Sequence, residues 1–258
     1  MLLALTCQLL FSQTQQKDSV QLPPLEVRAI RASERAPFAK QNLSKADIQK
    51  NNLGPDLPFL LNQTPSVVVQ SDAGNGIGYT GIRIRGTDAT RINVTINGIA
   101  YNDAESMGTF LVNLPDFASS VSSIQIQRGV GSSSNGPSAF GASINLSTHE
   151  LNEKAYFSTS NSAGSFGTLK NTLQFGSGLL KNHFTIDARI SKIKSDGYID
   201  RASSELGSYY ISGAYIAKKT SLRFTTFSGK EKTYQAWYGV SASDLENNRT
   251  FNPAGTEK

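Results

Sequence analysis

The sequence predicts an α+β domain followed by the first antiparallel strands of a transmembrane β-barrel. Three observations lead to this fold class. Only 17% of the 258 residues are charged and 22 are glycine, a composition typical of membrane barrels. No window approaches the roughly 18 uninterrupted apolar residues that a membrane-spanning helix needs. After His149 the chain alternates apolar and polar residues in short segments, which is the pattern of strands with one apolar face.

Composition also excludes several kinds of site. Cys7 is the only cysteine, and His149 and His183 are the only histidines. A disulfide framework is therefore excluded, and neither a transition-metal site nor a cofactor is expected. The net charge of +5 is spread along the chain, and residues 51–150 carry an acidic excess. Because phosphate binding needs clustered lysine and arginine, no nucleic-acid partner is expected.

The first 43 residues read as a leader and an arm. Residues 1–13 contain an apolar run that predicts a secretion signal, although it is imperfect or truncated because no basic residue precedes it and no A-x-A site follows. A buried amphipathic helix and lipid attachment at Cys7 are the alternatives. Residues 14–43 are polar and contain prolines 23, 24 and 37, so they predict a flexible or extended arm.

Residues 44–150 predict the α+β domain. The tetrapeptide SKAD (44–47) has the form of a capping box, and the leucines that follow recur at helical spacing. Pro55 and Pro58 interrupt this spacing, so two short helices are expected. From residue 67 the period changes to two, and glycine or Asn-Gly separates the strands. These predicted strands include residues 67–69, 82–86, 92–98, 124–129 and 141–148.

Residues 151–258 predict about five barrel strands. In residues 183–191, Phe184 and Ile186 face one way while Asp187 and Arg189 face the other. Short and longer connections alternate, as in outer-membrane barrels. The other predicted strands are 155–162, 169–177, 208–217 and 221–228. Since single-chain bacterial barrels have an even number of strands and plugged transporters about 22, the expectation is an N-terminal fragment with an incomplete barrel.

Two segments resemble nucleotide-binding motifs, but neither has the residues or the neighbouring helix that its motif requires. The segment GNGIG (74–78) leads into a strand rather than the helix that a dinucleotide loop requires. Residues 131–138 have the glycine spacing of a phosphate loop, but Pro137 replaces its lysine. Neither a G-x-S-x-G nor an H-E-x-x-H motif occurs. No catalytic residue and no enzymatic activity are expected, and a secreted hydrolase using Asp103 and Glu105 remains a rival interpretation.

Residues 64–103 and 122–148 resemble, in content and order, the plug domain of TonB-dependent outer-membrane receptors. Four features carry the resemblance: IRIRG (82–86), Arg91 before a strand ending at Asn97-Gly98, a strand ending at Arg128-Gly129, and a run of small residues that ends in a strand. Two positions depart from the family pattern, with Gln125 in place of Glu and Asn97 in place of Asp. The first departure weakens the inference of one particular plug-to-barrel ion pair.

The resemblance gives the arm a role. LPPLEVRAI (22–30) looks like a TonB box, an extended segment that adds a strand to a TonB-type periplasmic energy-coupling protein. The alternative is a disordered tail without a TonB box. The residues assigned to the box are Leu25, Glu26, Val27, Arg28 and Ala29.

The resemblance also implies two further sets of site residues. The basic side chains of the domain are expected to pair with acidic groups on the inner wall of the barrel; they are Arg83, Arg85, Arg91 and Arg128. Two loops at the plug apex are expected to contact the ligand, although ordinary turn chemistry is an equal alternative. Their residues are Asp72, Asn75, Tyr79, Tyr101, Asn102, Asp103 and Glu105.

The implied function is that of an outer-membrane receptor for TonB-dependent, energised uptake of a scarce ligand, with an iron chelate or siderophore expected. The implied partners are the coupling protein, outer-membrane lipid and the small-molecule ligand. The barrel is expected in the outer membrane, with plug and arm facing the periplasm. The sequence does not name the ligand. A non-transporting outer-membrane or secreted β-rich binding protein is the alternative.

Overall fold

The computed structural model describes residues 31–131, 139–234 and 236–254. The predicted secretion signal (1–13) and the predicted TonB box (25–29) lie outside these residues. In the described part of the chain, helices long and apolar enough to cross a membrane are absent.

The first half of the chain, called the plug below, contains two sheets. The larger sheet has the order β1-β6-β7-β4-β5, with β4 parallel to β7 and the other neighbours antiparallel. A hairpin of β2 and β3 forms the smaller sheet. The strands are β1 Lys40–Ser44, β2 Val67–Ser71, β3 Thr80–Ile84, β4 Ile92–Ile96, β5 Ile99–Ala100, β6 Ser123–Arg128 and β7 Ala142–Ser147. Strands β4 and β7 are buried at every residue, as is typical of strands that are covered on both faces.

Short helices cover the larger sheet. The two predicted short helices are present as α1 (Lys45–Asn51) and α2 (Leu57–Leu60), and Ser44 with Asp47 forms the expected capping box. Three 3₁₀ turns follow: η1 Ala89–Arg91, η2 Leu111–Asn113 and η3 Phe117–Ser120. Buried isoleucines of β4, β6 and β7 form the centre of one hydrophobic core with Ile48 of α1.

The predicted arm ends in ordered structure. Residues 40–43, which the sequence assigned to a flexible or extended arm, belong to β1 and pair with β6. Part of this order comes from hydrogen bonds of Gln125, a residue of β6. Its side-chain oxygen accepts a hydrogen bond from the Ala32 amide at 2.7 Å, and its side-chain nitrogen donates to the Ala32 carbonyl at 3.0 Å. A neutral amide can make both bonds at once.

The second half of the described chain is one antiparallel sheet, called the wall below. Its strands follow chain order from edge to edge. They are β8 Tyr156–Gly164, β9 Thr168–Gly176, β10 Phe184–Ser195, β11 Ser204–Ile216 and β12 Ser221–Thr233. Strands β8 and β12 are both edges, so the sheet is open. The expected fold class, an α+β plug followed by antiparallel strands of an unclosed barrel, is confirmed.

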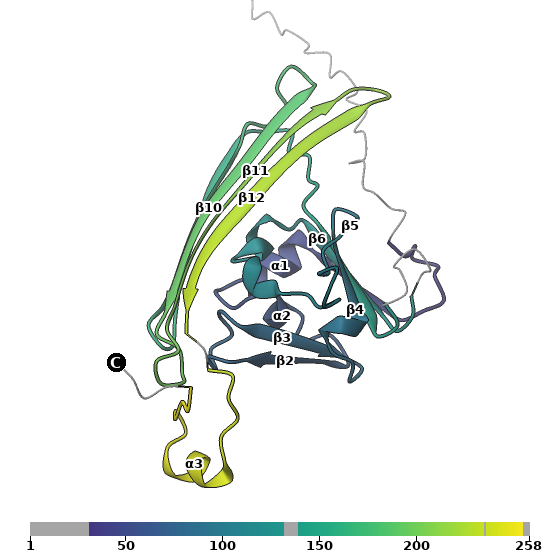
Figure 1. The fold of residues 1–258 in the computed structure, drawn as a ribbon. Coiled ribbons are helices and arrows are strands. Elements are labelled where there is room, and N and C mark those ends of the chain that lie inside the picture. Colours follow the sequence, from purple (N-terminus) through teal and green to yellow (C-terminus); the bar gives the residue numbers. More distant parts are fainter. Residues whose placement is uncertain (1–30, 132–138, 235, 255–258) are drawn as a thin grey trace, which may run out of the picture.

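The two faces of the wall differ as the alternation predicts. Phe184, Ile186 and Ile190 of β10 are exposed on the outward face, whereas Thr185 and Arg189 are buried on the inward face. Figure 1 shows the wall curving around the plug, which lies on its concave side. The polar face of the wall therefore meets the plug, and the apolar face is turned away from it.

The wall has two distinct ends. At one end, called the loop end, lie residues 165–167, residues 196–203 and the segment after β12 that contains α3 (Ala242–Asn247). Asp196 donates a backbone hydrogen bond to Phe166 here, at 2.8 Å. At the other end, called the turn end, lie residues 177–183 and 217–220. The loop end carries the longest connections.

Candidate functional site

A buried carboxylate, Asp116, joins the plug to the wall. Its two oxygens lie 2.7 Å from Lys170 Nζ of β9 and 3.4 Å from Arg189 Nη1 of β10, and all three side chains are at most 3% exposed. Thr172 and Ser191 of the same strands also donate hydrogen bonds to Asp116. These five residues are called the Asp116 cluster.

Local backbone geometry places Asp116 in this position. It follows Pro115 and adopts a left-handed conformation, with φ 48° and ψ 30°, immediately before η3. Aspartate tolerates this region better than most residues because its short side chain can bond locally, and Ser119 Oγ donates to it at 2.7 Å. Lys170 also donates to the side-chain oxygen of Asn52 at 2.8 Å. The cluster thus connects the end of α1, the start of η3 and two wall strands.

The charges in this cluster set the protonation of Asp116. Burial alone would raise the pKa of a carboxyl group, because a low-dielectric site disfavours its charged form. The adjacent Lys170 ammonium and Arg189 guanidinium outweigh burial and hold the pKa of Asp116 below its ordinary value. Asp116 is therefore an anion at neutral pH, paired with two buried cations.

A second contact places two carboxyl groups near each other. Asp56, directly before α2, is buried and accepts a hydrogen bond from Thr80 Oγ1 at 3.1 Å. Glu231 lies on the inward face of β12, and its carboxylate oxygens are buried without a hydrogen-bond partner among the described residues. Burial, followed by the charge of Glu231, raises the pKa of Asp56 well above its ordinary value.

Gly78 allows the plug to approach this part of β12 closely. Its φ is +91°, a conformation that L side chains rarely adopt. A Cβ atom at this position would lie 3.0 Å from Ser204 Oγ and 3.1 Å from Thr233 Oγ1 of the wall. Glycine therefore satisfies both the backbone conformation and the narrow gap between plug and wall.

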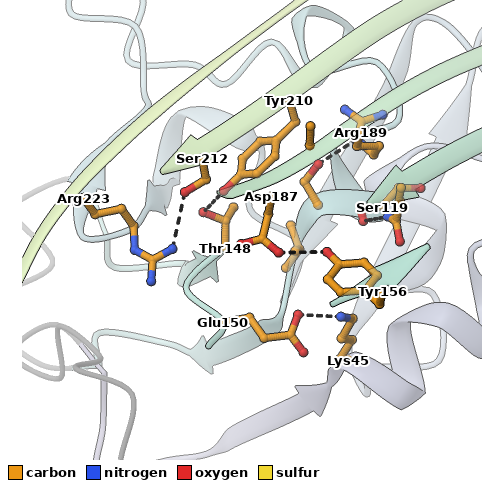
Figure 2. A pocket seen from close by; sticks show the side chains of 14 residues that line it. Lys45, Ser119, Thr148, Glu150, Tyr156, Asp187, Arg189, Tyr210, Ser212 and Arg223 are labelled. Atoms are coloured by element: carbon orange, nitrogen blue, oxygen red, sulfur yellow. Dashed lines mark hydrogen bonds and ion pairs between the residues drawn. The ribbon is translucent and has the colours of Figure 1, made fainter. Parts of the chain in front are cut away.

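A small polar pocket lies between the plug and the wall, on the side of Tyr156, the first residue of β8 (Figure 2). Its volume is about 40 Å³, which is room for more than one water molecule. Lys45 of α1 forms an ion pair with Glu150. The Tyr156 hydroxyl donates to Asp187 Oδ1 at 3.0 Å. Water can therefore reach polar groups on both sides of the interface.

The first predicted ligand loop, residues 72–79, lies against the loop end of the wall. The Ala73 carbonyl accepts a backbone hydrogen bond from Tyr198 at 2.8 Å, and Asn75 Nδ2 donates to Ser195 Oγ at 2.6 Å. Tyr79 makes an edge-to-face contact with Trp237, with ring centroids 6.1 Å apart. Burial raises the pKa of Asp72. The structure thus brings Asn75 and Tyr79 to the wall, while the Asp72 amide donates to the Tyr79 carbonyl within the loop at 3.0 Å.

The second predicted ligand loop has a different environment. Asn102 accepts from the Val94 amide and donates to the Ile92 carbonyl, so it holds the start of β4. Asp103 accepts from the backbone amides of Glu105 and Ser106, which is the turn chemistry weighed as an alternative. Tyr101 packs against the hydrophobic core. A role in ligand contact stays a prediction for these residues.

Two of the four predicted plug arginines make other contacts in the structure. Arg91 lies over the ring of Phe140, 5.5 Å from its centroid, and Arg128 Nη1 donates to the Pro65 carbonyl at 3.2 Å. In the described parts of the chain, the ion pairs that join plug to wall are those of Asp116, in which the plug supplies the acid and the wall the bases. Pairing of Arg83, Arg85, Arg91 or Arg128 with an acidic wall remains a prediction.

Sequence reasoning did not identify the Asp116 cluster. One signal was available: Arg189 stands on the polar side of an alternating strand, and Lys170 occupies the same kind of position in β9. Charged residues that face the inside of a barrel need partners when they are buried. Nothing in the segment NLPDF (113–117) marks Asp116 as that partner.

Comparison with known proteins agrees with this geometry. The family model for the TonB-dependent receptor plug domain matches residues 32–143. No curated protein sequence matches the chain. Similar solved structures include the ferric yersiniabactin uptake receptor FyuA from Yersinia pestis, with a TM-score of 0.67, 11% identity, and coverage of 86% of this chain and 36% of that one.

Two other solved structures share the fold. The siderophore receptor PirA from Acinetobacter baumannii has a TM-score of 0.57 and 17% identity over 76% of this chain and 32% of that chain. The unliganded ferric citrate transporter FecA has a TM-score of 0.63 and 18% identity over 84% and 34%. The chain thus spans about a third of the length of these receptors.

Proteins with this plug domain are transporters and not enzymes. The residues matched by the family model contain every strand of the plug except β7, of which only Ala142 and Ser143 fall within the match. The match to the ferric yersiniabactin uptake receptor covers 86% of this chain, so it extends beyond the plug into the wall. Residues 32–143 thus match the TonB-dependent receptor plug domain, and plug and wall together share the fold of these solved receptors.

Proposed function

We propose that this chain is the N-terminal part of an outer-membrane receptor that takes up an iron chelate with energy supplied through a TonB-type protein. The observation that carries the proposal is the contrast between the faces of the wall. The outward face is apolar, whereas the inward face holds the plug through polar contacts such as the Asp116 cluster. A plug held by hydrogen bonds and ion pairs can exchange them for water when it shifts, whereas an apolar contact would resist hydration.

The wall supports an outer-membrane location. Its strands run from 9 to 13 residues, which is long enough to cross a bilayer when tilted. Strand β10 presents Phe184, Ile186 and Ile190 outward, as lipid-facing residues of a barrel do. In this proposal residues 151–258 begin the barrel, residues 44–150 form the plug, and residues 14–43 form the arm on the periplasmic side.

The loop end supports ligand capture from outside the cell. There the 72–79 loop meets Tyr198 and Trp237 of the wall loops. Proteins of similar structure are a siderophore receptor, a ferric yersiniabactin uptake receptor and a ferric citrate transporter. An iron chelate is therefore the ligand class that we propose, with Asp72, Asn75 and Tyr79 as its first plug contacts.

The proposed mechanism makes and breaks no covalent bond. Ligand binding at the 72–79 loop changes the contacts between that loop and the wall. The change releases the predicted box, residues 25–29, for strand addition to the coupling protein. Energy from that protein then shifts the plug, and the polar pocket beside Lys45 and Glu150 supplies water to the contacts that open.

Deleting residues 25–29 from the full-length receptor tests the proposal. We expect energy-dependent accumulation of a ferric siderophore to fall to the background of receptor-free cells, while siderophore binding to the cells is retained. A deletion of residues 16–20 is a control of equal length in the same arm and should keep uptake. Unchanged uptake in the first variant would contradict the box assignment. Binding without uptake in the intact receptor would favour the non-transporting alternative.

A further inference from the structure

Four lysines form a compact group on the outward face of the wall near its loop end. Lys192 and Lys194 belong to β10, Lys230 and Lys232 belong to β12, and all four are exposed. Between them runs β11. The register places Gly207 opposite both Lys192 and Lys230, and places Glu205 opposite both Lys194 and Lys232. The group is called the lysine square below.

The centre of the lysine square is open. A Cβ atom added to Gly207 would have no neighbour within 4 Å. Neighbouring strands lie about 4.8 Å apart, so the backbones that carry Lys192 and Lys230 are about 10 Å apart, across Gly207. A depression of about 640 Å³ covers this position, and its lining includes Lys192, Lys230 and Lys232. An anionic group of phosphate size can therefore enter between the ammonium groups.

Charge compensation within the square is incomplete. Glu205 forms an ion pair with Lys192 at 2.8 Å, and both side chains are more than half exposed. Four cations and one carboxylate leave a net charge of +3. Like charges about 10 Å apart repel one another, although solvent screens exposed charges, so a bound anion would relieve this repulsion. The square is thus complementary to a ligand with more than one negative charge.

The position of the square along the wall identifies the source of that anion. Ile190 and Tyr209 are exposed in the row next to the square, and Phe184 with Leu222 is exposed near the turn end. From Phe184 to Lys192 a strand rises about 27 Å, or about 21 Å along the membrane normal at the usual barrel tilt. Because the apolar band of a barrel is about 25 Å tall, the lysines lie at its edge, where lipid headgroups lie.

We propose that the lysine square binds the phosphorylated headgroup of an anionic glycolipid in the outer leaflet of the membrane. The inference rests on the proposed function, because it requires the wall to span that membrane with its loop end outside. The phosphates lie over Gly207 between the lysines, and the acyl chains extend along Ile190 and Tyr209. Lysine acts here as a point charge for phosphate.

The test measures lipid retention by the full-length receptor. The protein is purified in a neutral detergent, stripped of lipid, and mixed with diphosphoryl lipid A, and bound lipid is counted by native mass spectrometry. The variant K192Q/K230Q/K232Q removes three charges of the square. The matched control K181Q/K218Q/K219Q removes three exposed lysines at the turn end. Heat-modifiable migration on gels confirms that each variant keeps a folded barrel.

We expect the first variant to bind diphosphoryl lipid A about 100-fold more weakly, since each lysine near a membrane surface contributes about fivefold, equal to about 1 kcal/mol. The control should match the unchanged receptor, and dephosphorylated lipid A should bind weakly to all three proteins. Inorganic phosphate at millimolar concentration should not displace the lipid, because it lacks the acyl contacts.

Two results would overturn the inference. Equal retention by both variants would show that the square does not select the lipid. Displacement by inorganic phosphate would assign the square to free anions instead. Either failure is distinct from failure of the proposed function, because the receptor would still fractionate with the outer membrane and take up its iron chelate. If the unchanged receptor were absent from that membrane, both proposals would fail.

Discussion

Two buried carboxyl groups of the plug meet the wall in opposite electrostatic settings. Asp116 faces Lys170 and Arg189, whereas Asp56 faces Glu231. Burial disfavours the charge of both groups, but only Asp116 has cations that more than offset it. The plug is therefore not held evenly: charge stabilises its contact with β9 and β10 and opposes its contact with β12.

Removing the Asp116 carboxylate should have the largest effect. In D116A, Lys170 and Arg189 remain buried without their anion, and an unpaired buried charge costs about 3–5 kcal/mol. We expect the backbone amides of residues 117–120 to exchange hydrogen at least about 150-fold faster in the full-length receptor, measured by mass spectrometry. The control is D88N at the exposed cap of η1, where asparagine also caps well. Equal exchange in D116A and D88N would contradict the prediction.

Acid should weaken the same contact reversibly. A carboxyl group whose pKa is lowered in the folded state contributes stability above its unfolded pKa and loses it as the pH falls through the folded pKa. Protection of residues 117–120, corrected for intrinsic exchange, should therefore be constant between pH 7 and 5. Protection should decrease once the pH is below 3.8, the ordinary pKa of an Asp side chain. D116N should lack this acid step, and a loss of protection already at pH 6 would point to another group.

The stability of the contact between Asp56 and β12 should change with pH in the opposite direction. A raised folded pKa means that stability is full below the unfolded pKa and decreases as the pH rises through the folded pKa. D56N removes the ionised form, so at pH 7.5 it should slow exchange in α2 by the equivalent of about 0.5–2 kcal/mol. E231Q should give a similar gain, and the double variant should gain little more. D72N, where burial alone raises the pKa, is the control. Destabilisation by both D56N and E231Q would refute the proposed repulsion.

The smallest effect is expected at the rim of the polar pocket. Lys45 and Glu150 form an ion pair, but each side chain is about a third exposed. E150Q should therefore change the exchange of α1 by only about 0.2–1 kcal/mol, and the difference should vanish in 0.5 M salt because exposed charges are screened. The effect of D116A should persist in that salt. A large, salt-resistant effect of E150Q would mean that this pair also anchors the plug.

The wall was more predictable from sequence than the interface. Alternation placed Phe184 and Ile186 opposite Asp187 and Arg189 because a strand has a strict period of two. Strands β11 and β12 nevertheless extend beyond the predicted ends, to Ser204 and Thr233. Their added segments contain charged residues. In a sequence, where burial is unknown, such segments look like loops. The Asp116 cluster unites residues more than 50 positions apart, and local patterns contain no information on such pairs.

The hydrogen bonds of Gln125 determine how tension would travel through the plug. The chain touches β6 at Ala32, moves away, and returns as β1 with Lys40 opposite Gln127 and Ser44 opposite Ser123. A pull from the N-terminal side of residue 31 would therefore load the hydrogen bonds of Arg31 to Ser123 and Asn145, and the two bonds between Gln125 and Ala32, before it reaches the ladder of β1. Glutamate at position 125 could only accept in its ionised form, so one of these two bonds would be lost. Gln125 thus belongs, with the partners of Arg31, to the first contacts among the described residues that such a pull would break.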